Sequence, residues 1–264
     1  MTLLVCSKST LHYLPQYDNI LLIASPPQKS ILTLKDSEED VVAIGGGAVI
    51  DAAKIISKTP IVCYPTTAAG SSATAWSVYW DGTTKCSIHR QIPRETIFEP
   101  SFIKSIPDEI RINTICDVIS HCLDSLNSIK ANSQSISNCE ISLNFLKNED
   151  NLSLLKAGHY AGKAIQITGT NLLHSLSYPI TAKYGISHGR ALACLLPKVF
   201  HLMSTVLSQD MLNIIKPLIS NLPCKLEDYK IDIEYAVDEA YKYSKMSECN
   251  ISFNSNMLKG ILNG

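Results

Sequence analysis

The stretch VVAIGGGAVIDAAKIIS, residues 41–57, decides the predicted fold. Its first four residues, 41–44, form a short apolar run rich in valine and isoleucine, which predicts a buried strand. Three glycines follow, and residues 48–57 then carry apolar side chains at helical spacing. A strand, a glycine turn and a helix in direct succession predict one unit of an α/β sheet.

Two further strands and a hairpin extend this unit. Residues 19–24 (NILLIA) and 61–64 (IVCY) are short apolar runs bounded by turn residues. Buried strands that are joined through helices predict a parallel sheet. Residues 76–80 and 84–88 flank Asp81-Gly82, and this pattern predicts a β-hairpin.

The second half of the chain is predicted to be helical. Amphipathic stretches after Pro107 predict helices at residues 108–129, 133–146, 153–177, 189–207, 209–218 and 232–246. The predicted architecture is therefore an α/β domain at residues 1–106 followed by an all-α domain at residues 107–264. The segment 127–138, rich in Ser and Asn, is either a solvated loop or a helix start. The polar tail after Glu248 is expected to fray.

Two loops of the first half have the composition of cofactor-binding loops. The glycines at 45–47 let a phosphate approach the backbone at a helix N-terminus, although such turns are often only structural. Asp51 follows one helical turn later, either as a polar contact or as a solvated residue. The loop PTTAAGSS, residues 65–72, ends a strand where cofactors bind to open sheets, and an ordinary turn is the alternative. Lys85 on the hairpin either reaches a cofactor or lies on the surface.

One carboxylate and three imidazoles in the second half predict a metal site. Asp117 and His121 are four residues apart, so on a helix they share one face. His174 and His188 cannot share a continuous helix, because fourteen residues would separate them by roughly 21 Å. A break is therefore needed between them, and Pro179 and Gly185 are the residue types that make one. Such a ligand set suits a divalent transition metal, although chance spacing of histidines is the alternative.

The composition is that of an ordinary globular protein, with 45% apolar residues. A net charge of −1 gives no reason to expect nucleic acid or an anionic membrane as a partner. No apolar run reaches the roughly 18 residues of a membrane span, and the N-terminus lacks a signal-peptide pattern. The nine cysteines contain no C-x2-C pair, so we expect no zinc ribbon, no structural disulfides and a cytoplasmic location.

Five motifs, taken in order, resemble the iron-containing (group III) alcohol dehydrogenase family. They are GGGAVIDAAK at 45–54, PTTAAGSSAT at 65–74, EPSFIKSIP at 99–107, DVISH at 117–121, and the segment from His174 to the His-Gly at 188–189. Tyr178, in HSLSYPIT, and the aromatic hairpin VYWDGTTKCS are similar to the phosphonoacetaldehyde reductase (hydroxyethylphosphonate dehydrogenase) branch of this family.

The resemblance implies a dehydroquinate synthase-like fold, with a trimmed dinucleotide-binding domain, a helical metal-binding domain and the active site between them. It implies hydride transfer between NADH or NADPH and a small polar aldehyde or alcohol, with phosphonoacetaldehyde as a candidate and phosphonate metabolism as the setting. The implied metal, Fe(II) or Zn(II), is held by Asp117, His121, His174 and His188. The implied cofactor contacts are Gly46, Gly47, Asp51, Thr66, Thr67, Ser71 and Lys85. Tyr178 either relays a proton or packs beneath His174.

The chain also departs from the family pattern. The loop of the second motif, residues 65–74, is one residue shorter than in the family. A loop threonine is replaced by Ala69, and Ser72 or Ala73 stands where the family has glutamate. We expect one strand–helix unit of the family's nucleotide domain to be missing. A non-catalytic family member is therefore the main alternative, and a sugar-phosphate cyclase of the dehydroquinate synthase type is another. Because family members often form dimers or larger assemblies, homo-oligomerisation is compatible with the resemblance.

Overall fold

A five-stranded parallel sheet forms the N-terminal half of the computed structural model, which describes residues 2–13, 19–24 and 26–264. The strands, in spatial order, are β2 (Ile20–Leu22), β1 (Thr2–Cys6), β3 (Asp40–Gly45), β4 (Val62–Pro65) and β7 (Glu95–Thr96). All neighbouring pairs are parallel, which confirms the predicted sheet type. The prediction missed β1, an apolar run at the very start of the chain, and β7, which is only two residues long.

The glycine turn connects β3 to α1 (Gly47–Ile56), as the opening stretch predicts. Apolar residues of α1, among them Val49, Ile50 and Ala53, pack into one core with strand residues such as Val5 and Val41. Four 3-10 helices complete this half: η1 (Lys8–Tyr13), η2 (Lys29–Leu34), η3 (Gly70–Ala73) and η4 (Pro100–Ile103). The last residues of β3 and β4, Gly45 and Pro65, are paired. The two predicted cofactor loops therefore start side by side at the carboxyl edge of the sheet.

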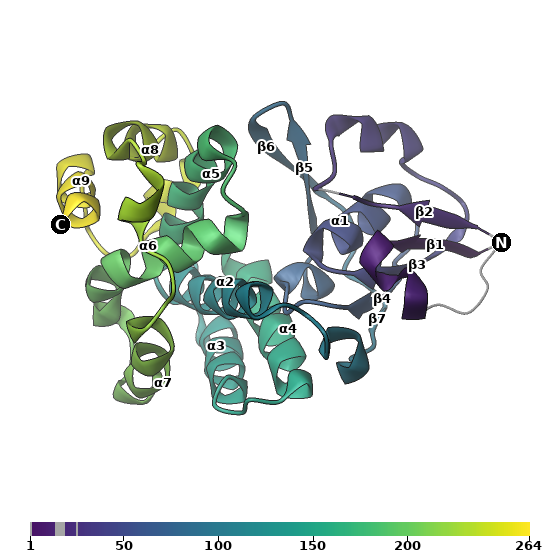
Figure 1. Ribbon diagram of the computed structural model, residues 1–264, viewed down its shortest axis with the longest axis horizontal. Coiled ribbons are helices and arrows are strands. Elements are labelled where there is room, and N and C mark those ends of the chain that lie inside the picture. Colours follow the sequence, from purple (N-terminus) through teal and green to yellow (C-terminus); the bar gives the residue numbers. More distant parts are fainter. Residues whose placement is uncertain (1, 14–18, 25) are drawn as a thin grey trace.

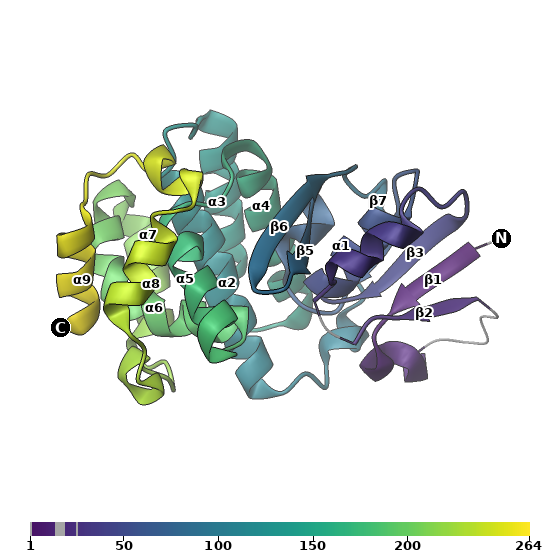
Figure 2. The same ribbon diagram turned by 90° about the horizontal axis from the view of Figure 1, so that it is seen from above.

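The predicted hairpin is present as β5 (Trp76–Asp81) and β6 (Thr84–His89), an antiparallel pair in which Trp80 faces Lys85. Figures 1 and 2 both show it between the sheet and the helices. The hairpin therefore extends from the sheet half toward the helical half.

Eight α-helices of the described chain build the second half around one hydrophobic core. They are α2 (Asp108–Leu126), α3 (Ser133–Phe145), α4 (Asn151–Thr168), α5 (Leu172–Tyr184), α6 (His188–Met203), α7 (Gln209–Ser220), α8 (Ile233–Ala240) and α9 (Ser255–Asn263). The 3-10 helices η5 (Ser204–Val206), η6 (Leu226–Tyr229) and η7 (Ser244–Glu248) lie between the last of them. Within the described residues, no helix has the length and apolar character that a bilayer crossing requires.

The prediction of one helix at 153–177 was wrong. Gly169 has φ +72, which ends α4 at Thr168, and α5 starts at Leu172 with Asn171 as its N-cap. The helix break between His174 and His188 is at Gly185, which has φ +68 and ends α5. Pro179 does not break the chain there, since it lies inside α5. Glycine adopts positive φ without steric cost, so α4 and α5 both end at a glycine.

The C-terminal tail also differs from the expectation of fraying. Residues 255–263 form α9, and its Leu258 and Leu262 are buried in the helical core. Part of the segment expected as a solvated loop or helix start is buried as well, because Asn127 and Ser128 are almost inaccessible. The amide N–H groups of Asn250 and Ile251 donate to Asn127, so the tail covers this segment.

The two halves meet where α4 packs against the loop after β4. A Cβ atom on Gly158 would lie 2.1 Å from the carbonyl oxygen of Ala68, and one on Gly162 would lie 2.4 Å from that of Gly70. Only glycine permits this approach of two backbones. Because the last strand ends at Thr96 and the first long helix begins at Asp108, we propose residues 1–106 and 107–264 as the two domains.

Candidate metal centre

Three helices bring the predicted ligands together. Asp117 and His121 share one face of α2, His174 lies in the first turn of α5, and His188 is the first residue of α6. The Oδ1 atom of Asp117 lies 3.7 Å from Nε2 of His121, 3.5 Å from Nε2 of His174 and 3.7 Å from Nε2 of His188. One oxygen atom is thus surrounded by one nitrogen from each imidazole.

Three of the four predicted ligands lie closer to one another than the fourth does. Ligand atoms of Asp117, His121 and His174 all lie within 4.8 Å of one another. His188 is not part of this tighter group, and its side chain is 37% exposed. Its ring nevertheless packs against that of His174, with centroids 5.2 Å apart. His188 therefore lies at the solvent side of the cluster.

Two atoms at the centre lack a partner. Asp117 Oδ1 and His174 Nε2 are buried without a hydrogen bond to any described residue. Buried polar atoms of this kind are rare in folded proteins, because leaving them unpaired is costly. A divalent cation would satisfy both, and one carboxylate with imidazoles is a donor set that zinc and iron accept. The residues present therefore fit a transition metal.

Asp117 and His121 have the protonation states that a metal ligand needs, whereas His174 does not. Loss of water contact alone would raise the pKa of Asp117, but the neighbouring imidazoles, His121 first, hold it below its usual range. Burial lowers the pKa of His121 to about 4, which leaves the ring neutral at pH 7. Burial also acts to lower the pKa of His174, but the nearby carboxylates of Asp117 and Asp124 raise it to about 10. A cation that binds His174 must therefore displace a proton, and its affinity should fall as the pH falls.

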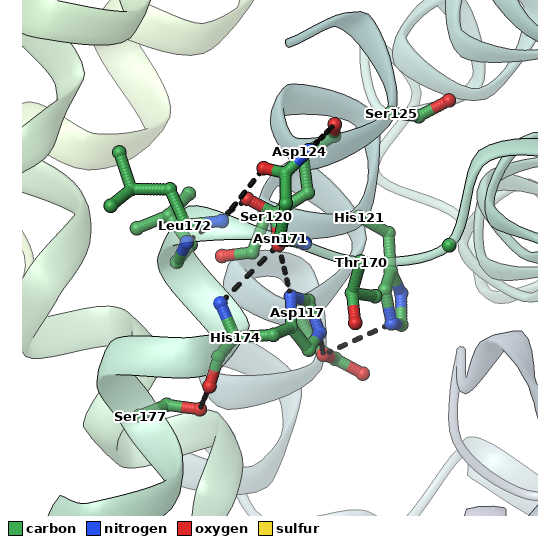
Figure 3. A network of polar contacts seen from close by, with 12 residues as sticks. Asp117, Ser120, His121, Asp124, Ser125, Thr170, Asn171, Leu172, His174 and Ser177 are labelled. Atoms are coloured by element: carbon green, nitrogen blue, oxygen red, sulfur yellow. Dashed lines mark hydrogen bonds and ion pairs between the residues drawn. The ribbon is translucent and has the colours of Figure 1, made fainter. Parts of the chain in front are cut away.

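Two residues that sequence reasoning missed hold the imidazoles from outside. Asp124 Oδ2 lies 2.8 Å from Nδ1 of His174, deep in the helical core (Figure 3). The Ser177 hydroxyl donates to the carbonyl of His174 at 2.7 Å, so its oxygen is left to accept from Nδ1–H of His188 at 3.2 Å. A usable signal existed for Asp124, because positions 117, 121 and 124 fall on one helical face.

We expect Ser177→Ala to weaken the affinity for a divalent cation by about tenfold, the lower end of what loss of an outer partner costs. Without the hydroxyl, His188 loses the bond that keeps its Nε2 atom toward Asp117. Competition with a chelator of known affinity measures the change. Ser120→Ala is the matched control, since Ser120 donates to the carbonyl of Cys116 at 2.7 Å and, within the described residues, no hydrogen bond links it to an imidazole. Equal affinities for both variants would contradict this role of Ser177.

The predicted cofactor residues of the two loops lie against one another. A Cβ atom on Gly46 would be 3.1 Å from Oγ1 of Thr67, and one on Gly47 would be 3.2 Å from Oγ of Ser71. The amide of Thr66 donates to the carbonyl of Gly45 at 3.0 Å. The two loops therefore form one continuous surface at the carboxyl edge of the sheet, the place where α/β sheets bind nucleotides.

Asp51 is not a solvated residue. Its exposure is 7%, and its carboxylate lies 3.0 Å from the ammonium of Lys54. Lys54, another residue that sequence reasoning passed over, also donates to the carbonyls of Ser71 at 3.1 Å and Thr74 at 3.2 Å. This buried lysine therefore ties the loop after β4 to α1.

Lys85 and Tyr178 connect the hairpin with the candidate metal centre. The Lys85 ammonium lies 3.6 Å from the centre of the Tyr178 ring. Burial acts to raise the pKa of Tyr178, but the charges of Lys85 and His174 outweigh burial and lower it. The ring stacks on His188 at 5.8 Å, and its hydroxyl lies 3.4 Å from that of Thr170. Tyr178 thus packs against the histidines while its acidified hydroxyl has a polar neighbour.

The structure thus places a parallel sheet with a glycine turn beside a helical bundle that gathers one carboxylate and three imidazoles into a candidate metal site. Residues 111–241 match the family model described as "Fe-containing alcohol dehydrogenase family, C-terminal". The chain is 27% identical to phosphonoacetaldehyde reductase of Streptomyces viridochromogenes over 57% of this chain and 49% of that protein. It is 30% identical to 4-hydroxybutyrate dehydrogenase of Clostridium kluyveri, over 57% of this chain and 51% of that protein.

Solved structures show the same fold. An iron-containing alcohol dehydrogenase from Thermotoga maritima aligns with a TM-score of 0.77, at 22% identity, over 98% of this chain and 90% of that chain. The fold class is therefore confirmed, and the matches together support the iron-containing alcohol dehydrogenase family for this chain. The alignments with three of the curated relatives cover 24%, 49% and 51% of those proteins, about half of their length or less.

Proposed function

We propose that this protein is a metal-dependent, NAD(P)-linked alcohol dehydrogenase or aldehyde reductase that acts on a small polar substrate. The observation that carries the proposal is the convergence of three imidazole nitrogens on Oδ1 of Asp117 within 3.7 Å. Fe(II) or Zn(II) are the proposed cations, since imidazole and carboxylate suit both. When bound, the cation supplies a Lewis acid for the substrate oxygen and the nicotinamide supplies the hydride.

The residues of the chain have separate tasks in this proposal. Asp117, His121, His174 and His188 hold the cation. Gly46, Gly47, Thr66, Thr67 and Ser71 form the surface for the cofactor phosphates, and Asp51 lies behind it, paired with Lys54. Lys85 is proposed to contact the cofactor, and its position over Tyr178 would bring that contact close to the histidines. Tyr178 is proposed to pass the substrate proton toward Thr170, because its hydroxyl is both acidified and next to that residue.

Phosphonoacetaldehyde is the first substrate that we propose to test, on the strength of the Streptomyces relative's name. Lys183 and Arg190, the basic residues that lie nearest to His188 in the sequence, give little support to a phosphonate substrate. Lys183 lies 3.8 Å from Asp232 and 3.6 Å from the ring centre of Tyr235, and Arg190 donates to Tyr229 at 2.8 Å. Lys85 is the better placed cation for an anionic substrate, since it contacts a neighbour of the histidines.

The test combines metal analysis with a cofactor assay. We expect about one divalent cation per chain and oxidation of NADH or NADPH in the presence of small polar aldehydes. Treatment with a chelator should abolish turnover, and Fe(II) or Zn(II) should restore it, because the proposed reaction needs a Lewis acid. Bound metal without any turnover over a broad aldehyde panel would favour a non-catalytic family member instead.

A further inference from the structure

Asp124 is the most heavily hydrogen-bonded side chain around the candidate metal centre. It lies on α2, two helical turns after Asp117, and is completely buried. Its Oδ2 atom accepts from the backbone amides of Asn171 at 2.9 Å and His174 at 3.3 Å, and it faces Nδ1 of His174 at 2.8 Å. Its Oδ1 atom accepts from the amide of Leu173 at 3.0 Å. Four N–H groups, three of the backbone and one of the ring, thus converge on one carboxylate (Figure 3).

The three imidazoles differ in what supports them from outside. Nδ1 of His174 faces the Asp124 carboxylate, Nδ1 of His188 faces the Ser177 hydroxyl, and Nδ1 of His121 has no partner among the described residues. A carboxylate that receives the ring N–H fixes the orientation of an imidazole and strengthens its other nitrogen as a ligand. That other nitrogen, Nε2 of His174, has no hydrogen-bond partner among the described residues and lies 3.5 Å from Oδ1 of Asp117.

The start of α5 depends on the same carboxylate. Asn171, the N-cap of α5, satisfies the amide of Leu172 with its own side chain at 2.7 Å. The amides of Leu173 and His174 are satisfied by Asp124. A helix start without such partners leaves its first N–H groups unpaired. Asp124 therefore fixes both the backbone and the ring of His174 relative to α2, the helix that carries Asp117 and His121.

We propose that Asp124 is a positioning residue of the metal centre, which sets the affinity for a divalent cation through His174 without touching the cation. This inference rests on the proposed function, because it requires that the four residues bind a metal. A role of Asp124 as a helix cap alone is the competing explanation. The two are separable, because a cap acts on folding stability whereas a positioning residue also acts on the ligand.

The test is a titration with Co2+ alone, whose visible absorption bands report its coordination geometry. We expect Asp124→Asn to bind Co2+ about 10–100-fold more weakly than the unchanged protein, with shifted bands. Asparagine keeps the shape of the aspartate side chain, but one carboxylate oxygen becomes an NH2 group. This group would face N–H donors and could not accept hydrogen bonds from them. Asn171→Ala is the matched control, since it removes the N-cap of α5 without removing the contact to the His174 ring. We expect it to lower the unfolding temperature of the metal-free protein and to change Co2+ affinity less than about threefold, with unchanged bands.

Each outcome decides a different question. If the unchanged protein binds no divalent cation, the proposed function fails. If that protein binds Co2+ and Asp124→Asn binds it equally well, or if Asn171→Ala loses affinity to the same degree, the positioning role fails and the cap explanation stands. Should Asp124→Asn not fold, long-range proton–nitrogen NMR spectra of the unchanged protein loaded with Zn2+ replace it. A protonated Nδ1 on His174 supports the proposal, and a metal-bound or unprotonated Nδ1 overturns it.

Discussion

His188→Ala is expected to abolish metal retention. Three ligands would remain, and the loss should exceed about 100-fold in affinity, because even an outer partner of a metal ligand is typically worth 10–100-fold. His188 is also the informative ligand to remove, since it lies outside the tight group of Asp117, His121 and His174. Its partial exposure means that its removal leaves no deep cavity, so the free energy of unfolding of the metal-free protein should change by less than about 1 kcal/mol.

Metal content after gel filtration, together with a chelator competition, measures this effect. His201→Ala is the control, because His201 is an exposed histidine in the last turn of the same helix. That control should keep the metal content of the unchanged protein. Full metal occupancy in His188→Ala would remove His188 from the ligand set and leave a site of three residues.

Gly158→Ala is expected to have the largest effect on folding. The added Cβ atom would lie 2.1 Å from the carbonyl oxygen, 2.3 Å from the carbonyl carbon and 2.6 Å from Cα of Ala68. All three are backbone atoms, so no side-chain rotation relieves the clash and α4 must move away from the loop. Alanine favours a helix over glycine by up to about 1 kcal/mol. Overpacking costs about 1–3 kcal/mol and occasionally more, so we expect a net loss of about 2 kcal/mol in the free energy of unfolding.

The same substitution should weaken cofactor binding, because Ala68 follows Thr67 in the loop that faces the glycine turn. Denaturant unfolding and titration with NADH or NADPH measure the two effects. Gly260→Ala is the matched control, since Gly260 lies inside α9 and a Cβ atom there meets nothing within 4 Å. Helix propensity alone predicts that this control is neutral or slightly stabilising. Unchanged stability and unchanged cofactor affinity in Gly158→Ala would show that the two halves can separate without cost.

The proposed site was only partly readable from the sequence. The four-residue step from Asp117 to His121 is a local helical relation, so the sequence predicts it. Asp124 continues that face, yet its role depends on the start of α5, which is far away along the chain. Lys54 is the last residue of the motif GGGAVIDAAK, but the neighbouring sequence does not indicate that its ammonium reaches carbonyls of the loop after β4. Such partners are missed because they come from a different element.

By itself, the sequence determined the parallel sheet type, the strand–glycine turn–helix at residues 41–57, the hairpin and a helical second half, because each follows from hydrophobic period and turn chemistry over a few residues. The tertiary structure alone decided that β1 pairs with both β2 and β3, and that α5 starts at Leu172 rather than continuing α4. It also decided that His188 faces the Asp117 oxygen from the solvent side. These features depend on which surfaces meet after the chain folds, and contacts between distant segments leave no local pattern in the sequence.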